Sequence, residues 1–420
     1  MARLVVHGGN PLHGSLEANG AKNAALPIMA ACLLAKGKVS LRRVPNISDV
    51  WTLTGILKAM GCKVEYDGNS LMEIDSSTLT TTKAPDHLVR KMNASFDIMG
   101  PLLAAYGEGE VSLPGGCNLG ARPVDMHIAG FRKLGAEVVS KSGFVQAKAT
   151  KLKGARILFP KVSVGATKNC LMAATVADGE TILENCAREP EIVDLANFLI
   201  AMGAKIEGVG RQKMTITGVP QLHPVDYNVV ADRIEVGTYL IAGAITEGDV
   251  TITGCVPEHV TSLLDLMREM NQEITVGEDF IRVQGRRPIT PIAVSTEPYP
   301  GFPTDLQPQL VALATLGTGT TTVTENIFNG RFMYAMELVR LGGDVRVSHR
   351  DVVIRGVKQL EGAPVDAPDI RAGGALVCAA LAANGESTIS GVNFIDRGYQ
   401  EIEKRLSQLG GKISRTDFED

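Results

Sequence analysis

The feature that most constrains this chain is a short sequence element that recurs six times at a nearly constant interval. A glycine followed by a β-rich run occurs as GKVSL, GEVSL, GETIL, GDVTI, GTTTV and GESTI, beginning at Gly37, Gly109, Gly179, Gly248, Gly319 and Gly385. Successive glycines are 66 to 72 residues apart. A fixed period of this kind indicates one repeated supersecondary unit, so six units of about 70 residues account for the whole chain.

Each unit carries a second marker 23 to 26 residues after the first. Here an amphipathic stretch ends and another β-rich run begins, and the residue at the junction is Gly61, Gly135, Gly203, Asn271, Gly342 or Gly410. Such a residue is typical of a helix end with left-handed backbone, where asparagine is the common substitute for glycine. We therefore predict helix, glycine, strand, loop, amphipathic helix and strand in each unit, with one or two further strands.

The helix that precedes the first marker is apolar nearly all round in most units. These runs cover residues 22–35, 169–177, 236–245, 310–316 and 375–383. A helix without a polar face must be buried on every side. Strands and amphipathic helices would then cover it, which predicts a two-lobed, inside-out α/β barrel with three units around a buried helical centre in each lobe.

The domain boundary is expected between the third and fourth units. Residues 22–230 would form the first lobe, which includes the loop around Cys117, and residues 231–420 the second. The first strand, near residues 4–7, could pair with either lobe on this evidence alone. Ligands commonly bind between domains, so the cleft between the lobes is the expected ligand site.

Composition excludes several classes of partner and location. A net charge of −4 gives no overall attraction to nucleic acid or to an anionic membrane. The longest apolar run, residues 24–35, is too short to span a bilayer, and no export signal opens the chain. Seven cysteines without paired spacing and without a Cys/His ligand grouping argue against disulfides and zinc. These features predict a cytoplasmic protein, and they imply no particular oligomer.

Polar or charged residues stand at the expected start of every buried helix. They are Lys22, residues 93–95, Ser163, Arg233, Asp305 and Arg371. Helix N-termini attract capping side chains and anionic ligands. A cap is the expected role of Ser163 or Asp305. It does not explain Lys22 or Arg371, because a cation is unfavourable there unless an anion is bound.

The stretch Pro114–His127 combines Cys117, flanked by glycines, with Arg122 and a proline-started helix. This pattern suits a mobile loop that brings a thiol to an anion, although a structural turn is a serious alternative. Gly115 and Gly120 have P-loop spacing, but Ala121-Arg122 stands where Lys-Ser/Thr is needed, which excludes a nucleoside triphosphatase. A cysteine hydrolase using His127 lacks a visible third member and oxyanion site.

Cations at equivalent places in the units suggest a shared anionic ligand. They are Lys22, Arg122, Arg331, Arg371 and Arg397. Arginine binds phosphate and carboxylate bidentately, so we expect this set to converge on one anion. Asp305 would face these cations, which would keep its pKa low and make it a weak base unless the substrate hydroxyl is well placed.

Seven runs resemble one known family across nearly the whole chain. They are NGAKNAALPI (19–28), LPGGCNLGARPVD (113–125), KVSVGAT (161–167), NCAREPEIVD (185–194), FPTDLQ (302–307), DIRAG (369–373) and IDRGYQEIE (395–403). The chain is similar here to the bacterial UDP-N-acetylglucosamine enolpyruvyl transferases. The resemblance implies transfer of the enolpyruvyl group of phosphoenolpyruvate to the 3′-hydroxyl of UDP-N-acetylglucosamine, by addition and elimination, at the first committed step of peptidoglycan synthesis. It implies no metal and no organic cofactor, and it assigns residues 1–21 to the second lobe.

The resemblance also assigns roles to individual residues. Cys117 matches the general acid and covalent phosphoenolpyruvate site, and Asp305 matches the proposed base for the sugar hydroxyl. Lys22, Arg122 and Arg397 match residues around phosphoenolpyruvate. The positions that match contacts to the sugar nucleotide are Asn23, Pro123, Val124, Asp125, Met126, Lys161, Val162, Ser163, Val164 and Ile327. Asp369 and Arg371 lie in a motif near the site.

The sequence departs from the family at a few site positions. Asn93 stands where the family usually has a substrate-site arginine, in Met-Arg-Ala-Ser. Asn329, Gly330 and Tyr334 also differ from the usual Glu-Asn-Arg and His pattern around Arg331. These changes leave two alternatives open: a weakly active or regulatory substrate-binding paralogue, and a transferase with another acceptor.

Overall fold

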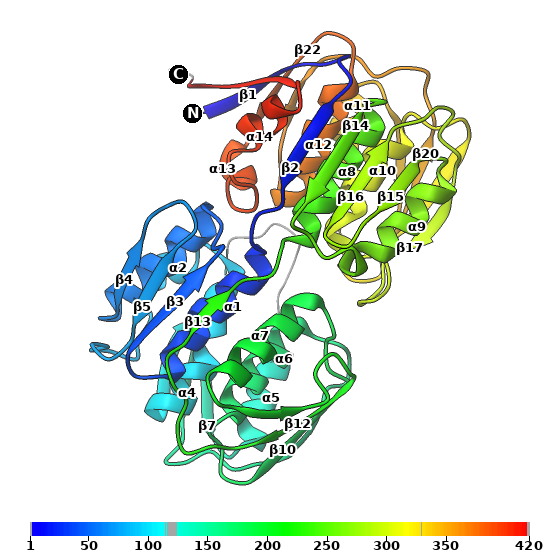
Figure 1. Cartoon of the computed structure of the whole chain (residues 1–420). Coiled ribbons are helices and arrows are strands. Elements are labelled where there is room, and N and C mark those ends of the chain that lie inside the picture. The colour runs from blue at the N-terminus through cyan, green and yellow to red at the C-terminus, as the bar shows by residue number, and fades with distance from the viewer. Residues whose placement is uncertain (1, 114, 116–123, 329, 418–420) are drawn as a thin grey trace. The chain divides into compact units, whose positions relative to one another are not determined.

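The computed structural model describes residues 2–113, 115, 124–328 and 330–417 (Figure 1). These residues form two compact units. One contains the described residues between Gly20 and Val230, and the other contains residues 2–19 and 231–417. Each unit has its own hydrophobic core.

The unit of residues 20–230 is built around three buried helices. These are α1 (Lys22–Ala31, continued by the 3-10 turn Cys32–Leu34), α4 (Met99–Tyr106) and α6 (Val164–Ala174). The covering helices are α2 (Ser48–Ala59), α5 (Asp125–Lys133) and α7 (Pro190–Ala201), with short segments α3 (Asp86–Val89) and η2 (Asn93–Ile98) between them.

Three small sheets complete this unit, in the strand orders β13-β3-β5-β4, β6-β8-β7 and β11-β12-β10-β9. The strands are β3 (Lys38–Arg42), β4 (Lys63–Tyr66), β5 (Met72–Asp75), β6 (Glu108–Ser112), β7 (Glu137–Lys141), β8 (Phe144–Lys148), β9 (Arg156–Leu158), β10 (Glu180–Glu184), β11 (Lys205–Glu207), β12 (Lys213–Thr217) and β13 (Asp226–Asn228). A parallel bridge between Lys83 and Glu110 occupies the place of a fourth strand beside β6.

The second unit repeats this arrangement around α8 (Arg233–Ile245), α10 (Gln307–Ala314) and α12 (Ile370–Ala382). Its other helical segments are η3 (Pro257–Val260), α9 (Thr261–Glu269), η4 (Thr304–Leu306), α11 (Ala335–Arg340), α13 (Val392–Ile395) and α14 (Ile402–Gln408). Its sheets have the orders β15-β16-β14-β2, β17-β18-β20-β19 and β21-β22-β1-β23.

The strands of the second unit include the first two of the chain. They are β1 (Ala2–His7), β2 (His13–Glu17), β14 (Asp249–Thr253), β15 (Glu273–Val276), β16 (Phe280–Gln284), β17 (Ala293–Ser295), β18 (Thr320–Thr324), β19 (Asp344–Ser348), β20 (Asp351–Arg355), β21 (Pro364–Asp366), β22 (Glu386–Ser390) and β23 (Lys412–Asp417). β1 lies between β22 and β23, and β2 pairs in parallel with β14. The first strand therefore belongs with residues 231–417 (Figure 1).

The repeat predicted from the sequence is confirmed in both its markers. The first-marker glycine lies immediately before a strand in five of the repeats (β3, β10, β14, β18 and β22) and is the second residue of β6 in the other. The six residues of the second marker all have positive φ, from 68° at Asn271 to 105° at Gly203. The apolar runs form buried helices, as expected, so the mixed α/β arrangement with helices inside is correct. Equivalent helix starts in the repeats carry the polar residues considered next.

Candidate active site

Asp305 is the centre of a group of charged side chains in the second unit. It lies in η4, immediately before the buried helix α10. Arg331 Nη1 donates to Asp305 Oδ1 at 2.9 Å, while Arg371 lies 3.1 Å from Oδ2 through Nη2 and 3.2 Å through Nε. The side chains of Arg331 and Arg371 are 3% and 4% exposed, whereas that of Asp305 is 25% exposed. Asp305 is therefore the most exposed of these three side chains.

The charges around Asp305 determine its protonation state. Burial by itself would raise the pKa of this carboxyl, but the positive charges of Arg371 and Arg331, a hydrogen bond from Arg331 and the charge of Arg233 hold the pKa well below its usual range. Burial in turn would lower the pKa of Arg371, and Asp305 counteracts this most strongly. The expected low pKa is confirmed, so Asp305 is an ionised but weak base in this arrangement.

Helix capping orients Arg371 toward Asp305. Asp369 is the N-cap of α12, and its Oδ1 accepts hydrogen bonds from the backbone N–H groups of Arg371 (2.8 Å) and Ala372 (3.1 Å). Arg371 is therefore the second residue of α12, and Asp305 is its counterion. The cap role considered for Asp305 is wrong, because its carboxylate binds arginines, whereas Ser163 does cap α6.

The expectation that Lys22 and Arg371 require a bound anion is also wrong. Lys22 Nζ lies 2.9 Å from Asp49 Oδ2, and both side chains are at most 10% exposed. Arg371 is paired with Asp305 in the same way. A carboxylate from elsewhere in each unit supplies the negative charge, and periodicity in the sequence gives no indication of these partners.

The predicted sugar-nucleotide positions of the first unit lie at the starts of helices. Asn23 is the second residue of α1 and is half-buried, and Asn93 begins η2 and is also half-buried. Val124 is buried at the N-cap position of α5, followed by exposed Asp125 and buried Met126. At the start of α6, Lys161 and Val164 are exposed, and Val162 and Ser163 are half-buried.

The cap at Ser163 leads to a prediction about stability. Its side chain accepts a hydrogen bond from the backbone N–H of Ala166 at 3.3 Å. Ser163→Ala should lower the free energy of unfolding by about 1 kcal/mol, because a helix donor loses its partner. Urea unfolding measures this loss, and Ser163→Asp should largely avoid it. Equal stability of the alanine variant and the wild type would contradict the capping role.

A second buried ion pair in the first unit is absent from the sequence predictions. Lys168 Nζ on α6 donates to Asp97 Oδ2 on η2 at 2.6 Å, and the two side chains are 10% and 6% exposed. Asn169 donates to Asp97 Oδ1 at 3.5 Å and accepts from the backbone N–H of Gly100. Lys168 directly precedes the apolar run 169–177 and stands between Thr167 and Asn169, so the local sequence does not show that it is buried.

His127 is buried in the same region. Its ring packs edge-on against Phe96, with centroids 5.3 Å apart. Burial, reinforced by the charge of Lys168 and opposed by Asp125, lowers the pKa of His127 to about 4. The imidazole is therefore neutral near pH 7.

Some of the remaining predicted residues are described by the structure, and others are not. Ile327 follows β18 and is 37% exposed, and Arg397 is half-buried after α13. Tyr334 is buried, and its hydroxyl donates to Gln307 Oε1 at 3.0 Å. Cys117, Arg122, Pro123 and Asn329 lie outside the described residues. The geometry thus joins Asp305, Arg331 and Arg371 directly.

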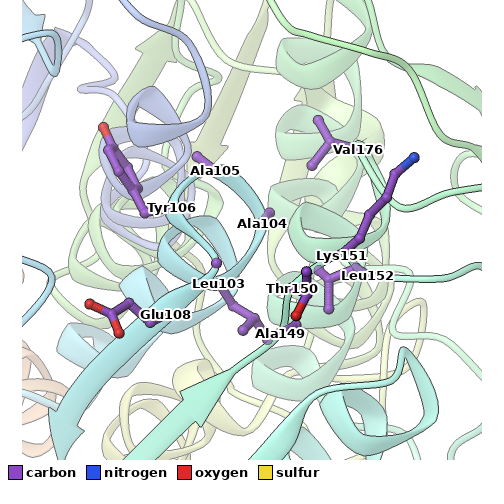
Figure 2. Close-up of a pocket in the computed structure, with 11 residues that line it drawn as sticks. Leu103, Ala104, Ala105, Tyr106, Glu108, Ala149, Thr150, Lys151, Leu152 and Val176 are labelled. Carbon is purple, nitrogen blue, oxygen red and sulfur yellow. The ribbon is translucent and has the colours of Figure 1, made fainter.

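A cavity of about 390 Å³ lies within the unit of residues 20–230. It is lined by residues 103–108, which include the C-terminal part of α4, by residues 149–152 and by Val176 (Figure 2). Figure 2 shows the charged groups of Glu108 and Lys151 on different sides of it. None of the predicted site residues lines this cavity, so it is not the candidate active site.

Among the described residues, no group of three or more His, Cys, Asp or Glu side chains could hold a metal ion. None of the helices in that part of the chain combines the length and apolar character needed to cross a membrane.

Comparison with known proteins identifies the family. Residues 6–406 match the EPSP synthase (3-phosphoshikimate 1-carboxyvinyltransferase) family. The chain is 48% identical over 418 residues to the UDP-N-acetylglucosamine 1-carboxyvinyltransferase of Koribacter versatilis, covering 99% of this chain and 96% of that protein. It is 46% identical to UDP-N-acetylglucosamine 1-carboxyvinyltransferase 1 of Carboxydothermus hydrogenoformans, with both chains covered completely.

Solved structures agree with this result. The enolpyruvyl transferase NikO from Streptomyces tendae superposes with a TM-score of 0.88 at 26% identity, covering 99% of each chain. An EPSP synthase from Acinetobacter baumannii shares the fold, with a TM-score of 0.77 at 18% identity over 99% of this chain and all of that one. The inside-out α/β fold and the match over nearly the whole sequence together show that the chain belongs to the EPSP synthase family of enolpyruvyl transferases.

Proposed function

We propose that this protein transfers the enolpyruvyl group of phosphoenolpyruvate to the 3′-hydroxyl of UDP-N-acetylglucosamine and releases phosphate. The observation that carries the proposal is the near-complete alignment, at close to half identity, with relatives named UDP-N-acetylglucosamine 1-carboxyvinyltransferase. The partly exposed side chain of Asp305, paired with two buried arginines, supports it. A role at the entry to peptidoglycan synthesis and a cytoplasmic location belong to the same proposal.

The chemistry requires an acid, a base and cationic groups. In the addition step, the sugar oxygen bonds to C2 of phosphoenolpyruvate and gives up its proton, while C3 gains a proton. In the elimination step, the bond from C2 to the phosphate oxygen breaks and C3 loses a proton. We assign the removal of the hydroxyl proton to Asp305 and the delivery of a proton to C3 to Cys117.

The other predicted residues would hold the two substrates. Lys22, Arg122 and Arg397 would bind the phosphate and carboxylate of phosphoenolpyruvate, because charge-assisted contacts to such groups are strong. Asp305 accepts a proton poorly while both arginines pair with it. A substrate anion that draws Arg331 or Arg371 away would raise the pKa of Asp305 and make it a stronger base.

A regulatory, substrate-binding role is the second candidate, because Asn93 replaces the arginine usual in the family. Asn93→Arg should improve kcat/KM by about 10- to 100-fold, since one charge-assisted contact is worth about 1.5 to 3 kcal/mol. Steady-state kinetics with both substrates measures the change. An unchanged kcat/KM would remove the argument that Asn93 weakens substrate binding.

The decisive experiment is phosphate release by the wild-type protein with phosphoenolpyruvate and UDP-N-acetylglucosamine together. Each substrate alone, and Cys117→Ser with both, serve as controls that should release little phosphate. Binding of UDP-N-acetylglucosamine by calorimetry without turnover would favour the regulatory role. Turnover only with another acceptor, such as shikimate 3-phosphate, would assign the protein to a different reaction of the family.

A further inference from the structure

Glu325 is a buried carboxylate that none of the assigned roles includes. It directly follows β18 and is 2% exposed. Oε1 accepts hydrogen bonds from Thr296 Oγ1 (2.9 Å) and from the backbone N–H groups of Ile327 (2.8 Å) and Phe328 (3.0 Å). Oε2 accepts from Thr304 Oγ1 at 2.8 Å. Every one of these partners donates, so the site is built for an acceptor-only group.

Thr304 connects Glu325 with the charged group at Asp305. Arg331 Nη1 donates to Thr304 Oγ1 at 2.9 Å and to Asp305 Oδ1 at 2.9 Å. A hydroxyl has a single hydrogen, and that of Thr304 is used toward Glu325. The direction of donation is therefore fixed as Arg331 to Thr304 to Glu325, and Asp305 shares Arg331 Nη1 with a neutral oxygen.

We infer that Glu325 and Thr304 are positioning residues for the transfer reaction, and this inference rests on the proposed function. Thr304 and Asp305 both accept hydrogen bonds from Arg331 Nη1, which limits the strength of the interaction between Arg331 and Asp305. Glu325 fixes the direction of that hydrogen bond and holds the turn that carries Ile327, a predicted sugar-nucleotide contact. Both residues act through Arg331 and Asp305 or through the turn at Ile327. A displacement of about 1 Å at a reacting group can cost about 100-fold in rate.

Substitutions at Thr304 separate positioning from general stability. Thr304→Val keeps the shape but removes the oxygen, so Arg331 would interact with Asp305 alone. We expect kcat to fall by about 10-fold or more, by analogy with the loss of a charge-assisted hydrogen bond. Thr304→Ser restores the hydroxyl and should return kcat to within about 3-fold of the wild type on the same grounds.

Thr246→Val is the matched control in the same unit. Thr246 is a buried threonine that donates to Ala242 O at 2.8 Å and accepts from Leu12 N at 3.3 Å, at the far end of α8. This variant should lower the thermal unfolding temperature while its kcat stays near that of the wild type. If Thr304→Val retained wild-type kcat, or if Thr304→Ser failed to rescue it, the positioning role of Thr304 would be wrong.

Glu325→Gln tests the other end of the connection. The amide places an N–H₂ donor where a second acceptor was, which conflicts with the donation from Thr304. We expect kcat to fall about as much as it does in Thr304→Val. In the double variant, kcat should fall by a factor well below the product of the two single factors, because both residues act on one connection. Multiplicative effects would show that the two residues act separately.

Amide hydrogen exchange of the substrate-free protein keeps this inference separate from the proposed function. Glu325→Gln should accelerate exchange at Ile327 and Phe328, because their acceptor is weakened, while Thr246→Val should not. Unchanged exchange at both amides would overturn the role of Glu325. Absence of turnover in the wild type would count against the proposed function, and the exchange data would still decide whether Glu325 holds this turn.

Discussion

Asp305→Asn should lower kcat by about 100- to 10,000-fold, the range that general acid–base groups contribute. Asparagine retains the shape of the side chain and one acceptor for the arginines, but it cannot take a proton from the sugar hydroxyl. The KM values should change less than kcat, because the arginines stay in place. Steady-state phosphate release with each substrate varied in turn measures both parameters.

The comparison with Asp305→Ala separates the chemistry from the fold. Alanine leaves Arg331 and Arg371 buried without their counterion, and each is less than 5% exposed. The free energy of unfolding should fall by about 3 kcal/mol for alanine and by clearly less for asparagine. Urea unfolding gives both values. An asparagine variant with near-normal kcat would show that another group removes the proton.

Lys168→Met should destabilise the protein by about 3 to 5 kcal/mol, because it leaves Asp97 buried without its cation. Lys168 Nζ and Asp97 Oδ2 are 2.6 Å apart, and both side chains are at most 10% exposed. Methionine fills a similar volume, so little of the loss would come from a cavity. Urea unfolding of the complete chain is the measurement.

Two controls define the origin of this loss. Asp97→Leu combined with Lys168→Met removes both charges and should recover most of the stability. Burial raises the pKa of Asp97, and Lys168 opposes that effect. A folded-state pKa above the unfolded value means that the folded protein binds more protons, so stability falls as the pH rises through this interval. The single variant should therefore be less impaired at pH 5 than at pH 8. A double variant as unstable as Lys168→Met would contradict this account.

The candidate site was predictable from the sequence only in part. Asp305 was expected among cations with a low pKa, and the structure confirms this with Arg331 and Arg371. At Lys22 a bound anion was expected, whereas Asp49 supplies the negative charge. Asp97, Lys168 and Glu325 were not predicted, because nothing in the local pattern distinguishes a buried, paired charge from an exposed one.

Local patterns in the amino-acid sequence specify the architecture of each repeat. Three of these patterns are local: the period near 70 residues, the helices without a polar face and the six left-handed helix ends. Each is imposed by backbone geometry and burial within one repeat. The strand that completes each sheet and the partner of each buried charge depend instead on contacts between distant segments. β1 enters the sheet between β22 and β23, and Arg371 reaches Asp305 across 66 residues of sequence. Strand pairing and ion pairing depend on the three-dimensional packing of segments remote in the chain, and no local periodicity encodes that packing.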